Sequence, residues 1–197
     1  KNPNTKNLFE KTPSMPITDF LNEISEAMQE LRDEKKRTAR RLAPDFSVFD
    51  MTRSDEMALS KCFAGLLNPE GGHGQGRLFL DKFLEKICGK RATWATGNCT
   101  VTLEKQANGQ RRIDIYLDFG SAGGVIGIEN KPWAGDQPNQ LSDYADYLKN
   151  KVTGKNKWLL LYFSNHEPSE ESIKPDELEK IKESGNFIYV NYDQVIA

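Results

Sequence analysis

Two short apolar runs joined by a glycine-rich segment constrain this chain more than any other feature. They span residues 113–117 and 126–131, and the connecting residues 119–124 include three glycines. Runs of this length that are rich in isoleucine are typical of β-strands, and glycine adopts the backbone conformations that turns require. We therefore expect an antiparallel pair of strands that turns within residues 119–124.

Charged side chains interrupt both of these apolar runs. Asp114 lies in the first run, and Glu129 and Lys131 lie in the second. Side chains two positions apart on a strand point to the same face, so Glu129 and Lys131 project together while Asn130 points away. Asp114 reaches the same cluster if the two runs pair. Two carboxylates beside an ammonium suit a divalent cation, because Mg²⁺ prefers oxygen ligands, and they indicate a metal-dependent phosphodiesterase.

A second interpretation of this cluster stays open. Carboxylates beside apolar neighbours are costly to bury without a partner, and a bound cation would remove that cost. The acids would equally be satisfied in an ordinary hairpin by ion pairs with Arg111 or Arg112. Lys131 would then only form a salt bridge to Glu129.

The order of Asp114 and Glu129-x-Lys131 resembles the PD-(D/E)xK nuclease superfamily, which includes restriction and repair endonucleases. Ile113 stands where the proline of the motif name would be. Downstream, the pair formed by Gln140 and Tyr144 resembles the Q-x-x-x-Y element of the RecB-like and lambda-exonuclease-like branches. The resemblance covers roughly residues 44–165, and upstream it matches an uncharacterised bacterial and phage branch. The matching upstream residues are Asp55 and Glu56, the segment 66–69, and the segment 73–76.

This resemblance implies an α/β fold, a restriction-endonuclease-like αβββαβ core whose mixed β-sheet is flanked by helices. It also implies Mg²⁺ or Mn²⁺ as the cofactor, held by Asp114, Glu129, the main-chain carbonyl of Asn130, and Glu56. Lys131 would orient or help to deprotonate the attacking water, or neutralise charge on the phosphate. The implied substrate is a nucleic acid, DNA rather than RNA because most relatives act on DNA.

Helical residues complete the expected catalytic set. Glu56 would hang from a helix over residues 54–67, with Ser54 as its N-cap. Asp55 is the alternative ligand, and an acid that only stabilises the helix dipole is the simpler interpretation. Gln140 and Tyr144 are four residues apart and share one helical face, so both can lean toward the metal, with Gln137 a weaker candidate. Tyr144 would equally serve as core packing.

Two further segments are candidates for substrate binding. The loop with His73 and Gln75 is rich in glycine and precedes a helix, where main-chain amides can bind phosphate. His73 would contact the substrate, or only hold the loop by a hydrogen bond. Residues 32–41 are strongly basic, and Arg37 and Arg40 would reach a phosphate backbone or line a solvated helix face.

The remaining pattern predicts two regions. Residues 1–43 form an N-terminal arm and an amphipathic helix, and residues 44–197 form the nuclease-like domain, with room for a truncated C-terminus because the chain stops just after a strand-like run. The helices expected in the second region lie at 54–67, 77–88, 138–149 and from 175, and the strands lie at 100–106, 112–119, 125–131, 158–163 and 186–191.

The buried face of the helix at 54–67 is expected to consist of Leu59, Phe63, Leu66 and Leu67, and in the helix at 77–88 the residues expected to point inward are Phe79, Leu80, Phe83, Leu84 and Ile87. Asn108 and Gly109 predict a hairpin between the first two strands. The almost unbroken apolar run at 158–163 predicts a central strand that is covered on both faces.

Composition narrows the function classes. The net charge of −2 gives no global attraction to nucleic acid, so local patches must carry any such binding. No apolar run is long enough to cross a membrane, and no signal peptide is visible. Three cysteines and two histidines without ligand spacing argue against zinc and favour reduced thiols in the cytoplasm. A catalytically silent nuclease fold that binds nucleic acid or a protein partner is the alternative function.

Overall fold

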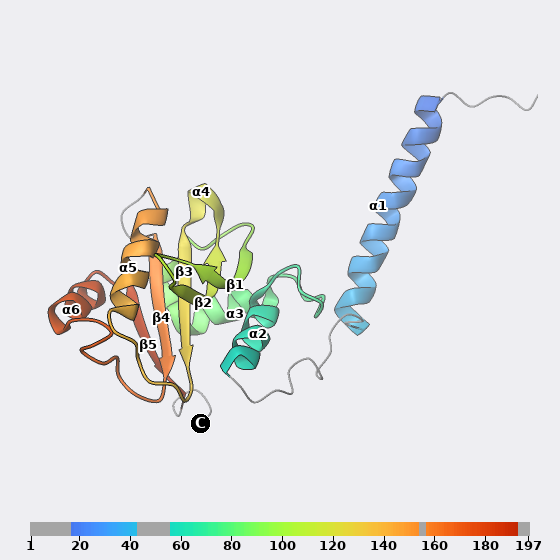
Figure 1. The fold of residues 1–197 in the computed structure, drawn as a ribbon. Helices are drawn as coiled ribbons and strands as arrows, with labels where there is room; N and C mark the ends of the chain where they lie inside the picture. Colours follow the sequence, from blue (N-terminus) through green and yellow to red (C-terminus); the bar gives the residue numbers. More distant parts are fainter. Residues whose placement is uncertain (1–16, 43–55, 154–156, 193–197) are drawn as a thin grey trace, which may run out of the picture.

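The computed structural model describes residues 17–42, 56–153 and 157–192, and a five-stranded mixed sheet is its central feature (Figure 1). The strands follow each other in space in chain order. The first three pair antiparallel and the last three pair parallel, which confirms the predicted mixed sheet. The strands are β1 (Thr100–Gln106), β2 (Arg112–Asp118), β3 (Val125–Lys131), β4 (Trp158–Ser164) and β5 (Phe187–Asn191).

Helices cover both faces of this sheet (Figure 1). One face packs against α2 (Glu56–Leu67) and α3 (Leu78–Phe83), and the other packs against α5 (Gln140–Lys151) and α6 (Pro175–Glu183). The chain order of helix, three strands, helix and strand is therefore the predicted αβββαβ core. The predicted N-cap at Ser54 lies outside the described residues.

The two faces bury separate apolar clusters, and the middle strands contribute to both. Every residue of β3 and of β4 is buried, as we expected for the apolar run at 158–163. Such runs form central strands because alternate side chains enter opposite faces, and both faces are covered. The fully buried members on the α2 side include Leu80, Ile115, Leu117, Ile126, Leu159 and Leu161, and those on the α5 side include Ile113, Leu141, Leu148, Leu160 and Tyr162.

The two predicted hairpins are both present. Asn108 and Gly109 turn the chain between β1 and β2, and Gly109 has a positive φ of 60°. Between β2 and β3 the glycine-rich segment forms one helical turn, α4 (Gly120–Gly123). The pairing of Ile115 with Ile128 fixes the register that the metal-site prediction requires.

The third predicted helix is not a single α-helix. α3 stops at Phe83, and the chain continues as a π-helical turn, η2 (Leu84–Cys88), and a 3₁₀ turn, η3 (Gly89–Ala92). Phe79 was predicted to point inward, but it is 38% exposed. Leu80 occupies the face of α3 that is toward the sheet. Phe79 therefore lies at the side of the helix, where its ring packs against the His73 ring in a T-shaped arrangement.

The buried face of α2 matches the prediction only at Leu67. Leu59, Phe63 and Leu66 are only half-buried. The fully buried positions are mostly small, which brings the helix close to the sheet and explains why the largest apolar residues lie at its margin. These buried positions are Ala58, Ser60, Ala64 and Leu67.

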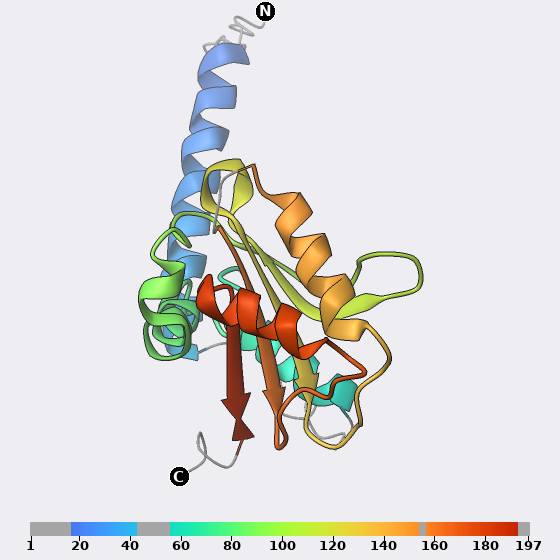
Figure 2. The same ribbon diagram turned by 90° about the vertical axis from the view of Figure 1, so that its left-hand side faces the viewer.

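An amphipathic N-terminal helix was also predicted, and α1 (Ile17–Leu42) forms it (Figure 2). Its apolar residues at helical spacing are all exposed, by 41% to 77%. In the part of the chain that the structure describes, no helix combines the length and apolar character needed to cross a membrane. The exposed apolar positions of α1 are Ile17, Leu21, Ile24, Met28 and Leu31.

Gly124 connects the hairpin turn to β3, and we expect Gly124→Ala to destabilise the fold by roughly 3 kcal/mol. Gly124 has a φ of 121°, and a Cβ there would overlap the main-chain oxygen of Lys157. Gly120→Ala is the matched control, because Gly120 also has a positive φ but faces open space. It should cost only about 1 kcal/mol. Denaturant unfolding measures both, and equal losses would contradict this account.

Candidate active site

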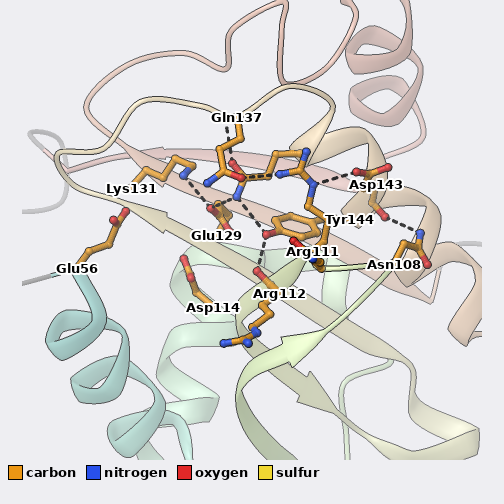
Figure 3. Close-up of a pocket in the computed structure, with 12 residues that line it drawn as sticks. Glu56, Asn108, Arg111, Arg112, Asp114, Glu129, Lys131, Gln137, Asp143 and Tyr144 are labelled. Carbon is orange, nitrogen blue, oxygen red and sulfur yellow. Dashed lines mark hydrogen bonds and ion pairs between the residues drawn. The ribbon is translucent and has the colours of Figure 1, made fainter.

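A polar pocket of about 620 Å³ opens where β2, β3 and α5 meet (Figure 3). All six predicted catalytic residues line it, although they come from four elements and span 89 positions of the chain, from Glu56 to Tyr144. The structure thus brings together Glu56, Asp114, Glu129, Lys131, Gln140 and Tyr144. The other lining residues are Asn108, Gln110, Arg111, Arg112, Gln137 and Asp143.

Sheet geometry positions the two strand carboxylates. Because Ile115 pairs with Ile128, the next residues toward the pocket, Asp114 and Glu129, lie beside each other. Oδ2 of Asp114 accepts a hydrogen bond of 2.7 Å from the main-chain N–H of Asn130. This bond fixes the first carboxylate against the strand that carries the second.

An irregularity in β1 lies opposite the same carboxylate. The ladder between β1 and β2 pairs Leu103 and Lys105 but omits Glu104, whose φ of 45° is positive. A non-glycine residue in this conformation is strained and interrupts regular pairing. Asp114 is therefore released from the ladder on one side, which leaves it free to face the pocket.

Glu129 is the most buried of the pocket carboxylates, with 2% exposure. Its Oε1 accepts hydrogen bonds from the Lys131 Nζ at 3.1 Å and from the Gln140 Nε2 at 2.7 Å. Its Oε2 is buried and has no hydrogen-bond partner. One oxygen is therefore held rigidly, and the other is a desolvated acceptor without a donor.

Burial and repulsion from neighbouring acids raise the pKa of both strand carboxylates. Burial raises the pKa of Asp114 from 3.8 to about 6, although the Asn130 N–H and Lys131 oppose this. Burial and the neighbouring Asp114 raise the pKa of Glu129 from 4.5 to about 8, against the attraction of Lys131. The pocket therefore disfavours two negative charges unless a further cation is present.

Glu56 supplies a third carboxylate from the first turn of α2. Figure 3 places it across from Lys131, on the helix that faces the strand ends. Its Oε1 is buried without a hydrogen-bond partner, like the Oε2 of Glu129. Glu56 also raises the pKa of both strand carboxylates by repulsion. The alternative ligand Asp55 lies outside the described residues.

These carboxylates fit a hard divalent cation. Only three buried polar side-chain atoms lack a partner among the described residues, and two of them are these pocket oxygens, on Glu56 and Glu129. Unsatisfied buried acceptors are costly and demand a positive partner. The donors are all oxygens, as Mg²⁺ and Mn²⁺ prefer. No three His, Cys, Asp or Glu side chains of the described residues lie close enough to form a complete metal cluster by themselves.

The side chain of Asn130 points away from the carboxylates, as the strand alternation predicted. Its Nδ2 donates to the Ser60 Oγ at 2.9 Å, and its Oδ1 accepts a hydrogen bond from the Tyr192 hydroxyl. The predicted metal role of this residue therefore concerns its main-chain carbonyl only. The side chain instead ties α2, which carries Glu56, to β3.

The start of α5 brings the last two predicted residues to the site. Asn139 has a positive φ of 56°, which asparagine tolerates better than most residues, and the helix begins at Gln140 immediately after it. Gln140 Nε2 bridges Glu129 and the Tyr144 hydroxyl, at 2.7 Å and 3.1 Å. The Tyr144 hydroxyl donates to the main-chain oxygen of Arg112. Tyr144 is thus both core packing and a hydrogen-bonded support of the site.

Arg111 and Arg112 line one side of the pocket, and the sequence motifs did not assign either of them to the site. Arg111 bonds to Asp143 at 3.1 Å and to Gln137 at 2.6 Å, so it ties the β1–β2 turn to the start of α5. Arg112 is 61% exposed and approaches only Glu104, at 3.6 Å. The alternative in which these arginines neutralise the catalytic acids is therefore not observed. Arg112 lies two positions before Asp114, and this nearness in the chain was the signal that could have assigned it to the pocket.

Three of the four predicted substrate-binding residues, His73, Gln75 and Arg37, are not among the residues that line the pocket. His73 is buried, accepts the Gln75 main-chain N–H at Nδ1 (3.0 Å) and lies 2.9 Å from the Asn68 oxygen at Nε2. Both ring nitrogens therefore hold the loop, and Gln75 bonds back to this residue. Arg37 is on α1 and pairs with Glu34 at 3.3 Å. Arg40 is also on α1, and its side chain lies outside the described set.

Comparison with known proteins identifies one family. A family model described as the PD-(D/E)XK nuclease superfamily matches residues 46–197, which include every residue that lines the pocket. No curated protein and no solved structure matches the chain.

We expect the metal-free protein to lose stability as the pH rises from about 4 to about 8, by on the order of 5 °C in Tm. Folding raises the pKa of Asp114 from 3.8 to about 6 and that of Glu129 from 4.5 to about 8. In this window the folded state binds more protons than the unfolded state, so stability present at low pH is lost as the pH rises. Thermal unfolding of EDTA-treated protein at a series of pH values measures the effect.

Glu129→Gln isolates the contribution of one group. It replaces the buried acid by a neutral isostere, so the pH dependence between about 6 and 8 should flatten. Asp146→Asn on the exposed side of α5 is the matched control and should keep the wild-type slope. A wild-type protein that gains stability relative to Glu129→Gln across this window would contradict the prediction.

Proposed function

Because the chain belongs to the PD-(D/E)XK nuclease superfamily, we propose that it is a metal-dependent nuclease that hydrolyses phosphodiester bonds, with DNA as the substrate. The nuclease unit would lie within residues 44–197, with the N-terminal arm and α1 as an addition to it. A cytoplasmic location belongs to the same proposal, and the three cysteines, none of which is in a disulfide, are compatible with it.

The observation that carries this proposal is the pair of orphaned buried oxygens. Glu56 and Glu129 each aim one unsatisfied acceptor into a pocket that also holds Asp114. Of the three cationic side chains that line the pocket, Lys131 pairs with the other oxygen of Glu129 at 3.1 Å, whereas Arg111 and Arg112 pair with Asp143 and Glu104. One ammonium beside Glu56, Asp114 and Glu129 suits a site that is completed by a divalent cation.

Asp114, Glu129 and Glu56 would hold Mg²⁺ or Mn²⁺, with the carbonyl of Asn130 as a further donor. A cation bound there polarises the scissile phosphate and makes a water molecule easier to deprotonate. The hydrogen bond from the Asn130 N–H keeps Asp114 oriented, and Gln140 keeps Glu129 oriented. These contacts prepare the carboxylates before the substrate arrives, which lowers the reorganisation needed for catalysis.

Lys131 would act on the attacking water or on charge that develops on the phosphate. Its side chain is only 6% exposed, and strand alternation directs it to the same side as Glu129. A buried ammonium interacts more strongly with a developing negative charge than one in bulk water. Its ion pair with Glu129 holds it within the pocket, close to where a phosphate would bind.

Arg112 and the tip of the β1–β2 turn would contact the phosphate backbone next to the cleaved bond. Arg112 has an exposed guanidinium and only a weak surface partner in Glu104. Such surface ion pairs contribute little, so the side chain can exchange this partner for a phosphate at small cost. A local basic wall of this kind compensates for the net charge of −2.

A catalytically silent nuclease fold is the alternative function. It would bind nucleic acid or a protein partner and would need no intact metal ligands. The presence of Asp114, Glu129 and Lys131 in one buried pocket favours the enzyme. A silent fold would have no use for two desolvated acceptors that destabilise the metal-free protein.

Cleavage of nucleic acid tests the proposal directly. We expect degradation of DNA that requires Mg²⁺ or Mn²⁺, stops with EDTA, and falls at least about 100-fold in Lys131→Ala and in Asp114→Ala. The assay would compare supercoiled, linear and single-stranded DNA with RNA, which also separates endonucleolytic from exonucleolytic action.

Matched variants control for charge alone. Lys86→Ala and Asp146→Ala remove the same charges at exposed positions outside the pocket and should keep full activity. Cleavage that survives in both Lys131→Ala and Asp114→Ala would overturn the assigned site. Metal-dependent binding without any cleavage would favour the silent alternative.

We expect Arg112→Ala to raise KM about fivefold with little change in kcat, because the side chain would contact phosphate away from the reacting atoms. The dependence of log KM on log salt should also become shallower by about one counterion. Steady-state cleavage at three salt concentrations measures both quantities. Arg91→Ala, at an exposed position on η3, is the control. A loss of kcat alone would point to a different role for Arg112.

A further inference from the structure

A solvent-exposed tryptophan stands on the loop that joins β3 to α5. Trp133 is 68% exposed and follows Lys131 by two residues. Outside α1, the described residues include only three large apolar side chains that are exposed in this way, and the other two, Leu78 and Phe79, lie together on α3. A tryptophan at such a position exposes a large apolar surface that a binding partner would cover.

The loop of Trp133 forms part of the rim of the catalytic pocket. Lys131 at its start and Gln137 near its end both line the pocket, and Figure 3 shows both of them there. Trp133 lies between these two positions, within five residues that must connect them. The Cα of Trp133 therefore lies within about 8 Å of the Cα of Lys131, since consecutive Cα atoms are only about 3.8 Å apart.

Several hydrogen bonds fix the backbone of this loop. The Pro132 oxygen accepts from the Asn165 Nδ2 at 3.3 Å. The Asp136 carboxylate accepts from the Tyr162 hydroxyl and from the Ser169 N–H, both at 2.7 Å. Since the loop is anchored on both sides of Trp133, the indole is presented without a large cost in ordering upon binding.

The chemistry of the loop favours stacking over charge recognition. Residues 132–135 carry no charge, and the charge of Asp136 is already used within the fold. A neutral indole beside a phosphodiester site has no attraction for phosphate, but it can stack on the face of a base. In an intact duplex the base faces are occupied by their neighbours, whereas an unpaired base offers a free face.

We propose that Trp133 stacks on an unpaired base next to the scissile phosphate, so that the enzyme prefers single strands, frayed ends or flaps over intact duplex. This inference rests on the proposed nuclease function and adds the substrate class to it. Arg112 and Trp133 would then contact the same strand, Arg112 at a phosphate and Trp133 at a base.

Fluorescence tests the contact without relying on activity. Among the three tryptophans of the chain, Trp158 is buried and Trp94 is half-buried, so stacking on Trp133 should dominate any quenching by bound nucleic acid. A labelled 10-nucleotide single strand and a blunt 15-base-pair duplex are the probes, and anisotropy reports binding of each. Ca²⁺ accepts the same oxygen ligands as Mg²⁺. It replaces Mg²⁺ in this assay so that cleavage is slow during the measurement. We expect quenching by the single strand and little by the duplex.

Variants of Trp133 distinguish stacking by an aromatic ring from contact by any large apolar side chain. Trp133→Ala and Trp133→Leu should both raise KM for single strands about tenfold and leave kcat and duplex cleavage unchanged, while Trp133→Phe should retain most of the affinity. Leu78→Ala removes an exposed apolar side chain on α3 and should change nothing.

The possible outcomes distinguish the two proposals. Binding by anisotropy without quenching, or equal single-strand KM in wild type and Trp133→Ala, overturns the stacking contact while the nuclease proposal stands. If neither probe binds and no nucleic acid is cleaved with Mg²⁺ or Mn²⁺, both proposals fail.

Discussion

Buried negative charge at the ends of β2 and β3 is the constraint on which the site depends. Glu56, Asp114 and Glu129 share the pocket, Lys131 pairs with only one oxygen of Glu129, and one oxygen each of Glu56 and Glu129 has no hydrogen-bond donor. Burial and repulsion raise the pKa values of Asp114 and Glu129, so the metal-free fold is held under electrostatic stress. A bound cation would relieve that stress by interacting with the charged form of each acid. Stability and the proposed function would then be coupled through the same oxygens, as is common where a protein keeps unfavourable groups at a functional site.

Much of the fold follows from local sequence patterns. The fully buried strand β4 and the two hairpins were predicted because apolar runs and the turn at Asn108 and Gly109 are local signals. The break at Phe83 and the small-residue face of α2 were not, since both depend on how closely a helix can approach the sheet. Helical periodicity cannot reveal a π-helical turn, because one inserted residue changes the hydrogen-bond pattern without changing the composition.

The proposed catalytic cluster could be predicted for a different reason. Strand alternation places Glu129 and Lys131 on one face, and helical spacing does the same for Gln140 and Tyr144. The pocket unites all four with Asp114. Substrate-binding residues have no such local rule, because their role depends on which loop reaches the rim. His73 illustrates this, since its glycine-rich surroundings suggested ligand binding, but both of its ring nitrogens serve the loop itself.

The contacts around the pocket differ in how they can respond to a substrate. The Arg111 side chain bonds to Asp143 and Gln137, so it links the β1–β2 turn to the start of α5 and cannot reorient without breaking both bonds. Arg112 is solvent-exposed with a weak partner, so it can reorient at little cost. Trp133 has both a fixed and a mobile part. Its loop is anchored by hydrogen bonds, and its side chain is exposed to solvent and does not pack in the core. A rigid acidic centre, a cation that can reorient and an exposed aromatic side chain on an anchored loop would favour a flexible strand over a stiff duplex, because the strand can adapt to a site that has little room to adapt itself.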